Sequence, residues 1–166
     1  AVELIPPAYA CINLEDIAAP RCFEIERRRR DSLDIPVFND DQHGTAIVVL
    51  AALLNALRIV NKPIASVRVV ILGIGAAGVA VARLLLAEGV GDVITLNRNG
   101  ILRANDPALD DDRAWIAEHT NIERRTGGLE EALPGADVFI GLSGPGLVTE
   151  DHLRLMNPDS IVFALA

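Results

Sequence analysis

From Val67 onward, short β-branched runs alternate with longer apolar runs that suit helices. Strands that alternate with helices form parallel sheets covered by helices on both faces. The pattern therefore predicts an α/β fold with a doubly wound parallel sheet. Gly89 and Thr149 are expected to cap the ends of two of its helices. The expected strands are 67–72, 92–97, 137–143 and 160–166, and the expected helices are 79–89, 112–120, 128–136 and 149–156.

The first 45 residues lack this alternation and predict irregular structure with short helical pieces. The expected elements are a helix over 19–33, a short β-like run over 35–38 and a helix from about Thr45 to Val60. Thr45 is a suitable N-cap for the last of these. Ala, Val and Leu line nearly every side of that helix, which predicts that it is buried. We therefore expect a short, mainly helical segment over 1–60 and the sheet over 61–166.

Composition narrows the classes of partner. The chain has 166 residues, 51% of them hydrophobic, which is enough for a folded domain with a real core. Its net charge of −8 and pI of about 4.8 argue against a nucleic acid or an anionic membrane as partner. The one basic run, "ERRRR" at 26–30, is flanked by acids and is typical of a solvated helix face.

Two cysteines, Cys11 and Cys22, are too few for a disulfide framework and indicate reduced thiols in a cytoplasmic protein. The longest apolar run, Ala46 to Leu54, is too short to span a bilayer. The chain opens without methionine and closes on "SIVFALA", which reads as a buried strand. We expect a segment of a longer protein, with the sheet truncated at its C-terminal end.

A glycine turn carries the strongest functional signal. "GIGAAG" at 73–78 follows a predicted strand directly and opens a predicted helix, the context in which G-x-G-x-x-G indicates a Rossmann-like dinucleotide site. Gly73 permits the tight turn, Gly75 lets the backbone approach a pyrophosphate, and Gly78 lets helix and strand pack closely. Free N–H groups at the helix start would face the phosphates. The predicted cofactor-binding residues here are Gly73, Ile74, Gly75, Ala76, Ala77 and Gly78.

Two further positions bear on the cofactor. The end of the second strand should offer an acid to the ribose hydroxyls, but Asn97 stands there with Arg98 beside it. An amide binds a ribose hydroxyl less strongly than a carboxylate and repels a 2′-phosphate less. The choice between NAD and NADP therefore stays open. NAD is favoured, because a single arginine is little to bind a 2′-phosphate. Ser143 and Gly144, after the third strand, either line the nicotinamide side or form an ordinary turn.

Two acidic clusters precede the glycine turn: Glu15–Asp16 and Asp40–Asp41. Carboxylates that converge in a cleft repel one another unless a cation is present. Oxygen ligands suit Mg²⁺ or Mn²⁺ rather than zinc. Ordinary surface acids are the alternative reading of both clusters. His43, in the same stretch, is either a ligand or, more simply, a hydrogen-bonding residue in the turn before the helix.

Several stretches together resemble malic enzyme of the compact bacterial, NAD(P)-dependent type. The resemblance runs in order from about Ile12 to Ala166. It implies a chain made of the C-terminal part of a malate- and metal-binding domain and connecting helix (1–60), followed by an incomplete NAD(P)-binding domain (61–166). The stretches are "INLEDI", "CFEIERR", "IPVFNDDQHGTAIVVLAALLNAL", "VVILGIGAAGVAVARLLL" and "DVFIGLSGPG".

The resemblance implies oxidative decarboxylation of L-malate to pyruvate and CO₂ with NAD(P) and Mg²⁺ or Mn²⁺. Matched by motif, Glu15, Asp16 and Asp41 resemble the metal ligands, and Asp40 resembles the neighbouring acid that supports the site. The family habit also suggests a dimer or larger homo-oligomer. Asn39 stands where compact bacterial members usually carry histidine.

The family's general base is a Lys and its general acid a Tyr, both upstream of "LED", and neither Lys62 nor Tyr9 matches those motifs. We therefore expect the chain alone to be inactive. The alternatives are a dinucleotide-binding module without catalysis, a malolactic enzyme-like protein, or another Rossmann dehydrogenase.

Overall fold

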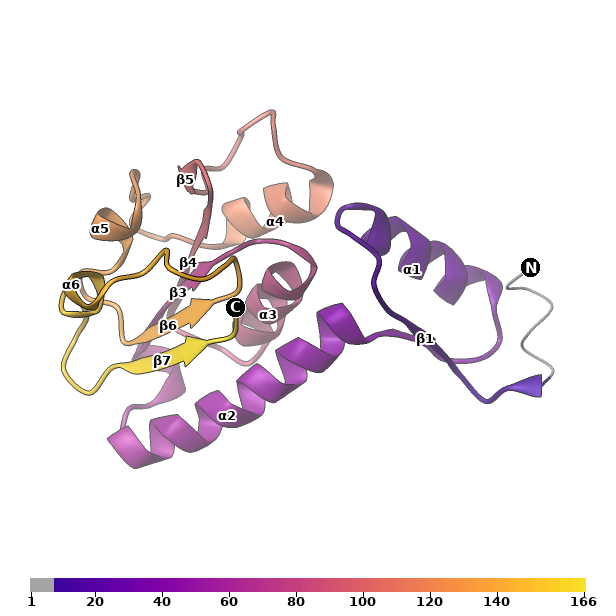
Figure 1. Ribbon diagram of the computed structural model, residues 1–166, viewed down its shortest axis with the longest axis horizontal. Coiled ribbons are helices and arrows are strands. Elements are labelled where there is room, and N and C mark those ends of the chain that lie inside the picture. The colour runs from indigo at the N-terminus through magenta and orange to yellow at the C-terminus, as the bar shows by residue number, and fades with distance from the viewer. Residues whose placement is uncertain (1–7) are drawn as a thin grey trace.

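The computed structural model describes residues 8–166, which form a parallel sheet with its helices and a smaller lobe beside them (Figure 1). The lobe, at the right of Figure 1, holds the first helix and a pair of short strands, and a long helix leads from it to the sheet. The elements are β1 (Ile12–Leu14), α1 (Arg21–Ser32), β2 (Val37–Asn39), η3 (Asp40–Gly44), α2 (Thr45–Val60), η4 (Ile64–Ser66), β3 (Arg68–Leu72), α3 (Ala76–Ala87), β4 (Asp92–Asn97), β5 (Gly100–Ile101), α4 (Asp111–His119), α5 (Leu129–Ala132), β6 (Val138–Gly141), α6 (Glu150–Leu153) and β7 (Ile161–Ala164).

The main sheet has five strands in the order β5-β4-β3-β6-β7. Four strands are parallel, with Val70 paired to Ile94 on one side and to Phe139 on the other. The short β5, which the sequence did not predict, runs antiparallel to β4 at one edge. The predicted parallel sheet is confirmed, and all carboxyl ends of its parallel strands share one edge, where doubly wound folds bind ligands.

Helices cover both faces of the sheet, and alternate strand residues divide between them. Val69 and Ile71 pack in one core with residues of α2, α3 and α4. Val70 and Leu72 pack in a second core with residues of α5 and α6. Because successive side chains of a strand point to opposite faces, one strand serves both cores. The doubly wound prediction is confirmed.

Two of the three predicted helix caps are confirmed. Gly89 has a positive φ of 85° and lies just past α3, where its N–H and that of Val90 bond back to the last turn. The Thr149 hydroxyl accepts from the His152 N–H at the start of α6. Thr45 is not an N-cap, because the chain is already helical from Asp40 through the wide π-helical turn η3.

The lobe contains strands that the sequence did not predict. β1 pairs with β2 in parallel, with Leu14 opposite Asn39. Three-residue strands carry too little pattern to be distinguished from loops, and the partners lie 25 residues apart in the chain. The pairing has a functional consequence, since it brings the segment that follows Leu14 beside the turn that follows Asn39.

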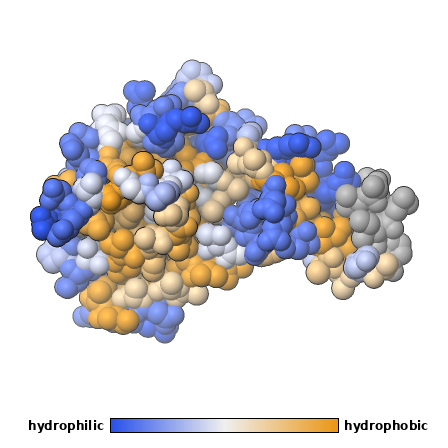
Figure 2. Space-filling view, in the orientation of Figure 1, coloured by the Kyte–Doolittle hydropathy of each residue, from blue (hydrophilic) through white to orange (hydrophobic). Residues whose placement is uncertain are grey.

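The prediction that α2 is buried on nearly every side is wrong. Val49, Leu53 and Leu57 are buried against the sheet layer, but Val48 and Ile59 are 66% and 85% exposed. In Figure 2 hydrophobic residues gather over β7 and along α2. By length and mean hydropathy of 1.8, Asp40–Val60 could cross a membrane; helices of water-soluble cores meet the same criterion, and α2 packs against α3.

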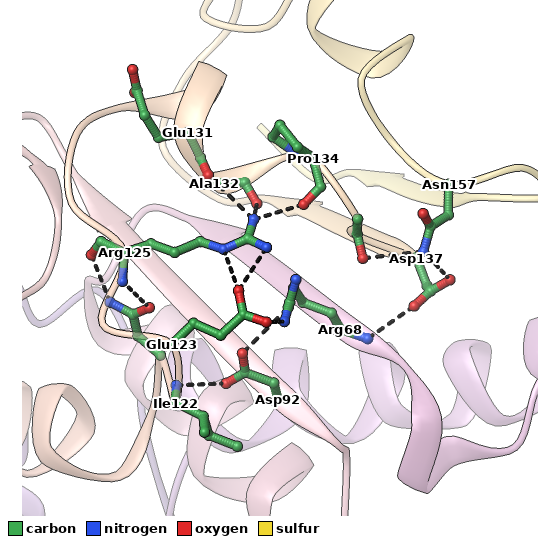
Figure 3. Close-up of polar contacts among 12 residues, drawn as sticks. Arg68, Asp92, Ile122, Glu123, Arg125, Glu131, Ala132, Pro134, Asp137 and Asn157 are labelled. Carbon is green, nitrogen blue, oxygen red and sulfur yellow. Dashed lines mark hydrogen bonds and ion pairs between the residues drawn. The ribbon is translucent and has the colours of Figure 1, made fainter.

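Charged side chains at the amino ends of the parallel strands form a paired network (Figure 3). Arg68 bonds to Asp92 and Glu123 at 3.3 and 2.6 Å, and Arg125 bonds to the other Glu123 oxygen at 2.9 Å. Arg125 also donates to the carbonyl of Pro134 at 2.6 Å. These bonds fix the starts of β3 and β4 to the loops that surround them.

Asp137 accepts a second group of hydrogen bonds at the amino ends of the strands. Its oxygens accept from Lys62 Nζ at 2.9 Å, from Asn157 Nδ2 at 3.0 Å and from the Arg68 backbone N–H at 3.0 Å. Burial acts to raise the pKa of Asp137, but the hydrogen bonds from Lys62, Asn157 and the Arg68 backbone outweigh it, so the pKa lies below its usual range.

Candidate functional site

The glycine turn has the geometry of a phosphate-binding loop. Gly73 has a φ of 109°, which favours glycine, and a side chain at Gly78 would collide with the Gly73 carbonyl oxygen. A Cβ at Gly75 would meet nothing within 4 Å, so the backbone there faces open space. α3 begins at Ala76, three residues earlier than predicted, and its free N–H groups point toward this space.

Two other segments hold the turn in place. Arg113 of α4 donates from Nε to the Ile74 carbonyl at 2.7 Å and is itself fixed by Asp110 at 2.9 Å. The loop after β6 packs on the opposite side, since the Ser143 backbone nitrogen lies 2.8 Å from where a Gly73 Cβ would stand. Ser143 therefore borders the turn, and the proposal that Ser143 and Gly144 line the nicotinamide side stays a prediction.

The two acidic clusters meet in front of the glycine turn. The Asp16 backbone N–H donates to Asp41 Oδ2 at 2.8 Å, with Asp16 in the left-handed conformation at φ 58°. Asp16 and Asp41 line one open cleft of about 450 Å³ together with the glycine turn. Its full lining is Asp16, Ile17, Ala18, Ala19, Asp41, Gly75, Ala76, Ala77, Gly78 and Leu142.

Helix α1 braces the acidic turn η3 from behind. Glu26 is only 6% exposed, and its two oxygens contact Gln42 Nε2 at 3.0 Å and His43 Nε2 at 2.7 Å. His43 is thus a hydrogen-bonding residue of the turn, the simpler of the two predicted roles. The arginines of "ERRRR" are exposed or half-buried, as predicted, but Glu26 at the start of that run is not part of the solvated face. π-helical turns often occur at functional sites, which fits the position of Asp40 and Asp41.

The predicted metal ligands have the carboxylate oxygens that a divalent cation prefers, but only two of the three lie in the cleft. Asp16 and Asp41 share the cleft, whereas Glu15 is exposed one residue away, and no three acids, histidines or cysteines among residues 8–166 are grouped closely enough to hold a metal ion. Asn39, directly before the acids, is fully buried, and its side-chain oxygen and nitrogen have no partner among the described residues. Buried amides are rarely left unpaired, so this turn is suited to a further polar partner.

Asn97 is the last residue of β4, as the sequence predicted. Its Oδ1 accepts from the Asn99 N–H at 2.7 Å and so closes the turn into β5. A separate pocket of about 480 Å³ opens beside it. The lining of that pocket includes Asn97, Arg98 and, after β5, Arg103.

The single lysine lies far from the cleft. Lys62 bonds to Asp137 and to the Pro158 carbonyl at the amino edge of the sheet, opposite the glycine turn. Tyr9 is exposed and does not line the cleft. Neither residue lines the cleft, and the expectation that neither matches the proton-transfer positions stays a prediction.

Three supporting residues escaped the sequence analysis. Arg113, Glu26 and Gln42 each act over 16 or more positions in the chain, through the contacts to Ile74 and within the acidic turn. The only local signal for Gln42 was its position in the sequence, directly after the two candidate acids Asp40 and Asp41 and before an apolar helix. Arg113 and Glu26 looked like ordinary members of charged helices.

The family model and the curated relatives that match nearly the whole chain are all described as malic enzymes. A family model described as "Malic enzyme, NAD binding domain" matches residues 42–166. The chain is 50% identical over 165 residues to the NAD-dependent malic enzyme of Geobacillus stearothermophilus, covering 99% of this chain and 34% of that protein. It is 48% identical over 165 residues to the NADP-dependent malic enzyme of Halomonas elongata, covering 98% of this chain and 38% of that protein.

The fold agrees with a solved structure of the same kind. The NAD-dependent malic enzyme of Thermotoga maritima superposes with a TM-score of 0.95 at 47% identity, over 99% of this chain and 44% of that one. The chain thus spans between a third and a half of the length of these relatives.

Proposed function

The chain belongs to the malic enzyme family, and from that premise we propose that the full protein oxidises and decarboxylates L-malate to pyruvate and CO₂, reducing NAD(P) to NAD(P)H. The observation that carries the proposal is the cleft in which Asp16 and Asp41 face the glycine turn. A cofactor loop alone would suit many dehydrogenases. Paired carboxylates beside it suit a hydroxy acid substrate held by a divalent cation, as in this family.

On this proposal the glycine turn binds the dinucleotide pyrophosphate. Gly75 offers the open space, and the N–H groups at the start of α3 offer hydrogen bonds to the phosphate oxygens. Arg113 keeps the turn in position through the Ile74 carbonyl. Ser143 and Gly144 are proposed to line the nicotinamide side, because their loop packs against Gly73.

We propose Glu15, Asp16 and Asp41 as the ligands of Mg²⁺ or Mn²⁺, with Asp40 in support. When bound, such a cation withdraws electron density from the C2 oxygen of malate and stabilises the negative charge that develops as CO₂ leaves. Asp16 and Asp41 are already held together by the 2.8 Å hydrogen bond, and Glu15 lies next in the chain. The Asp40 side chain makes no hydrogen bond or ion pair among the described residues, so its carboxylate is available.

The proton-transfer groups are proposed to come from outside this chain. Lys62 is committed to Asp137 at the far edge of the sheet, and Tyr9 lies away from the cleft. The chain therefore supplies the cofactor loop and the carboxylates but no general base or acid. We expect the isolated chain to show no turnover of malate, and the full protein to show it.

The test is malate-dependent reduction of NAD or NADP by the full protein in the presence of Mn²⁺. Asp41→Asn should abolish the activity and weaken Mn²⁺ binding, measured by electron paramagnetic resonance of the free ion. The matched control is Asp34→Asn, an exposed aspartate outside the cleft, which should behave as wild type. Full activity in Asp41→Asn would overturn the ligand assignment, and no malate-dependent reduction in wild type would overturn the function. Lactate instead of pyruvate as product would indicate the malolactic alternative.

Assembly and location complete the proposal. The exposed apolar residues Val48 and Ile59 on α2 support a dimer or larger oligomer of the full protein, which light scattering tests. Cys11 and Cys22 are both free thiols, which supports the cytoplasm as its location. The net charge of −8 supports small molecules rather than nucleic acid as partners.

A further inference from the structure

The pocket beside the end of β4 concentrates unpaired positive charge. It has a volume of about 480 Å³, and Arg98 and Arg103 both line it. Both arginines are exposed, and neither makes a hydrogen bond or ion pair within residues 8–166. Nearby arginines behave differently, since Arg113 pairs with Asp110 and Arg125 pairs with Glu123. Two free guanidinium groups in one pocket of an acidic chain suit an anionic ligand.

The opposing negative charge is small. The one carboxylate in the lining is Asp106, and its Oδ1 is already occupied by the Ala108 N–H at 2.9 Å. Thr126 and the backbone of Gly127 and Gly128 complete the far wall and add no charge. The pocket therefore has an excess of positive charge, in contrast to the acidic cleft at Asp16 and Asp41.

Asn97 changes the chemistry at the strand end. A carboxylate at this position accepts hydrogen bonds from both ribose hydroxyls and repels a 2′-phosphate. Here the Asn97 oxygen is already bonded to the Asn99 N–H, which leaves the Nδ2 group as the part available to a ligand. That group is a donor only, so it can bond a phosphate oxygen and offers no negative charge against one.

We propose that this pocket binds the 2′-phosphate of NADP, with Arg98 and Arg103 as the charged donors and Asn97 as a neutral one. The inference deepens the proposed function and rests on it, because the dinucleotide must first occupy the glycine turn. β3, which leads into the turn, pairs with β4, and in doubly wound folds the adenosine ribose of a dinucleotide on such a turn lies at the end of the next strand. The sequence alone favoured NAD because Arg98 was a single arginine; the structure adds Arg103, five residues on.

The relatives do not decide the cofactor. The protein of Geobacillus stearothermophilus is named NAD-dependent and that of Halomonas elongata NADP-dependent, at 50% and 48% identity. The preference is therefore a property of the residues around this pocket. Each guanidinium that contacts a phosphate contributes a charge-assisted hydrogen bond, and its loss corresponds to about a tenfold weaker complex.

The experiment is a fluorescence titration of the full protein with NADPH and with NADH at the same ionic strength. We expect NADPH to bind at least about tenfold more tightly, and its Kd to rise more steeply with salt. Equal affinities, or tighter binding of NADH, would overturn the 2′-phosphate assignment while leaving the proposed function intact. If neither dinucleotide binds, both the assignment and the proposed function fail.

Variants locate the effect. Arg98→Gln and Arg103→Gln should each weaken NADPH about tenfold and leave NADH nearly unchanged. Asn97→Asp should shift the preference toward NADH, because it restores a carboxylate at the strand end. Arg58→Gln, an exposed arginine on α2 outside the pocket, is the control and should change neither affinity. Circular dichroism checks that each variant is folded. An unchanged NADPH affinity in the folded double variant of Arg98 and Arg103 would overturn the assignment.

Discussion

The two edges of the same sheet use charge in opposite ways. At the amino edge, Arg68, Asp92 and Asp137 are held in ion pairs and hydrogen bonds of 2.6 to 3.3 Å (Figure 3). At the carboxyl edge, the side chains of Arg98 and Arg103 make no hydrogen bond or ion pair among the described residues. Both edges are exposed to the same solvent and stand at the ends of the same strands.

This difference separates stability from ligand binding. Charges that are partly buried and paired hold the loops of the amino edge and leave no capacity for a ligand. Charges that face a cleft without partners contribute little to the fold, and their interaction energy remains available to a substrate or cofactor. Substitutions at the two edges should therefore have different readouts, which the following predictions use.

The largest effect is expected at the glycine turn. Gly78→Ala forces a Cβ against the Gly73 carbonyl and should lower the unfolding free energy by about 2 kcal/mol and NADPH affinity by about 100-fold. Gly75→Ala is its matched partner, because a Cβ there meets nothing within 4 Å. It should keep the unfolding free energy and still lose NADPH affinity. Urea unfolding and fluorescence titration measure both, and tight binding by Gly75→Ala would show that the open space is not the pyrophosphate site.

The next largest effect is expected from Lys62→Met, which should change the stability of the fold and leave ligand binding unchanged. It removes the partner of the partly buried Asp137 and should cost about 2 kcal/mol of unfolding free energy. The Kd for NADPH and the kcat of the full protein should stay within about twofold of wild type, since Lys62 lies at the far edge. A stable variant with a large loss of kcat would make the only lysine of the chain a catalytic group and break the separation of the two edges.

Glu26→Ala tests whether α1 positions the acidic turn. Loss of the contacts to Gln42 and His43 should weaken Mn²⁺ binding about tenfold, while NADPH affinity stays unchanged. Glu24→Ala on the same helix is the control, because Glu24 is exposed and among residues 8–166 pairs with Arg28 alone. Glu26→Gln should recover part of the Mn²⁺ affinity. Equal losses in the Glu24 and Glu26 variants would mean that the helix acts through general stability.

The smallest effect concerns pH. The folded-state pKa of Asp137 lies below its usual range, so its ionised form stabilises the fold above the unfolded pKa of about 4, and that contribution is lost as pH falls through the folded-state pKa. The Glu123 carboxyl behaves alike, because hydrogen bonds from Arg68 and then Arg125 lower its pKa. Urea unfolding between pH 7 and pH 3 should show that the unfolding free energy falls as the pH is lowered. The fall should be smaller in Lys62→Met, which lacks the partner of Asp137. A parallel pH profile in both proteins would contradict the role of the pair.

Local pattern was sufficient to predict most of the sheet. Strands β3, β4, β6 and β7 and the glycine turn were expected because each is specified by a short contiguous run. Gly89 and Thr149 were identified as caps for the same reason, since capping depends on neighbouring residues. The bounds predicted for α2, Thr45–Val60, are confirmed, but the π-helical turn before it at Asp40–Gly44 was not predicted. That turn has no sequence signature of its own and is held by Glu26, 16 residues away from Gln42.

In the candidate site, too, features set by neighbouring residues were predicted and features set by distant contacts were not. The acids and the glycine turn were identified as residue types, but their convergence required the β1–β2 pairing and the Asp16–Asp41 bond, which span about 25 residues. Arg103 was missed because only the β5 turn brings it beside Arg98. The roles of Glu15, Ser143 and Gly144 remain predictions that the experiments on the full protein address.

Hydrogen–deuterium exchange of the full protein, with and without NADPH and Mn²⁺, compares the two edges in one measurement. We expect protection on ligand addition at Gly73–Gly78, at Asp16–Ala19 and over Asn97–Arg103, with no change in the amides around Arg68, Glu123 and Asp137. Protection at the amino edge, or none at the glycine turn despite saturating ligand, would contradict the assignment of the carboxyl edge as the place where cofactor and cation bind.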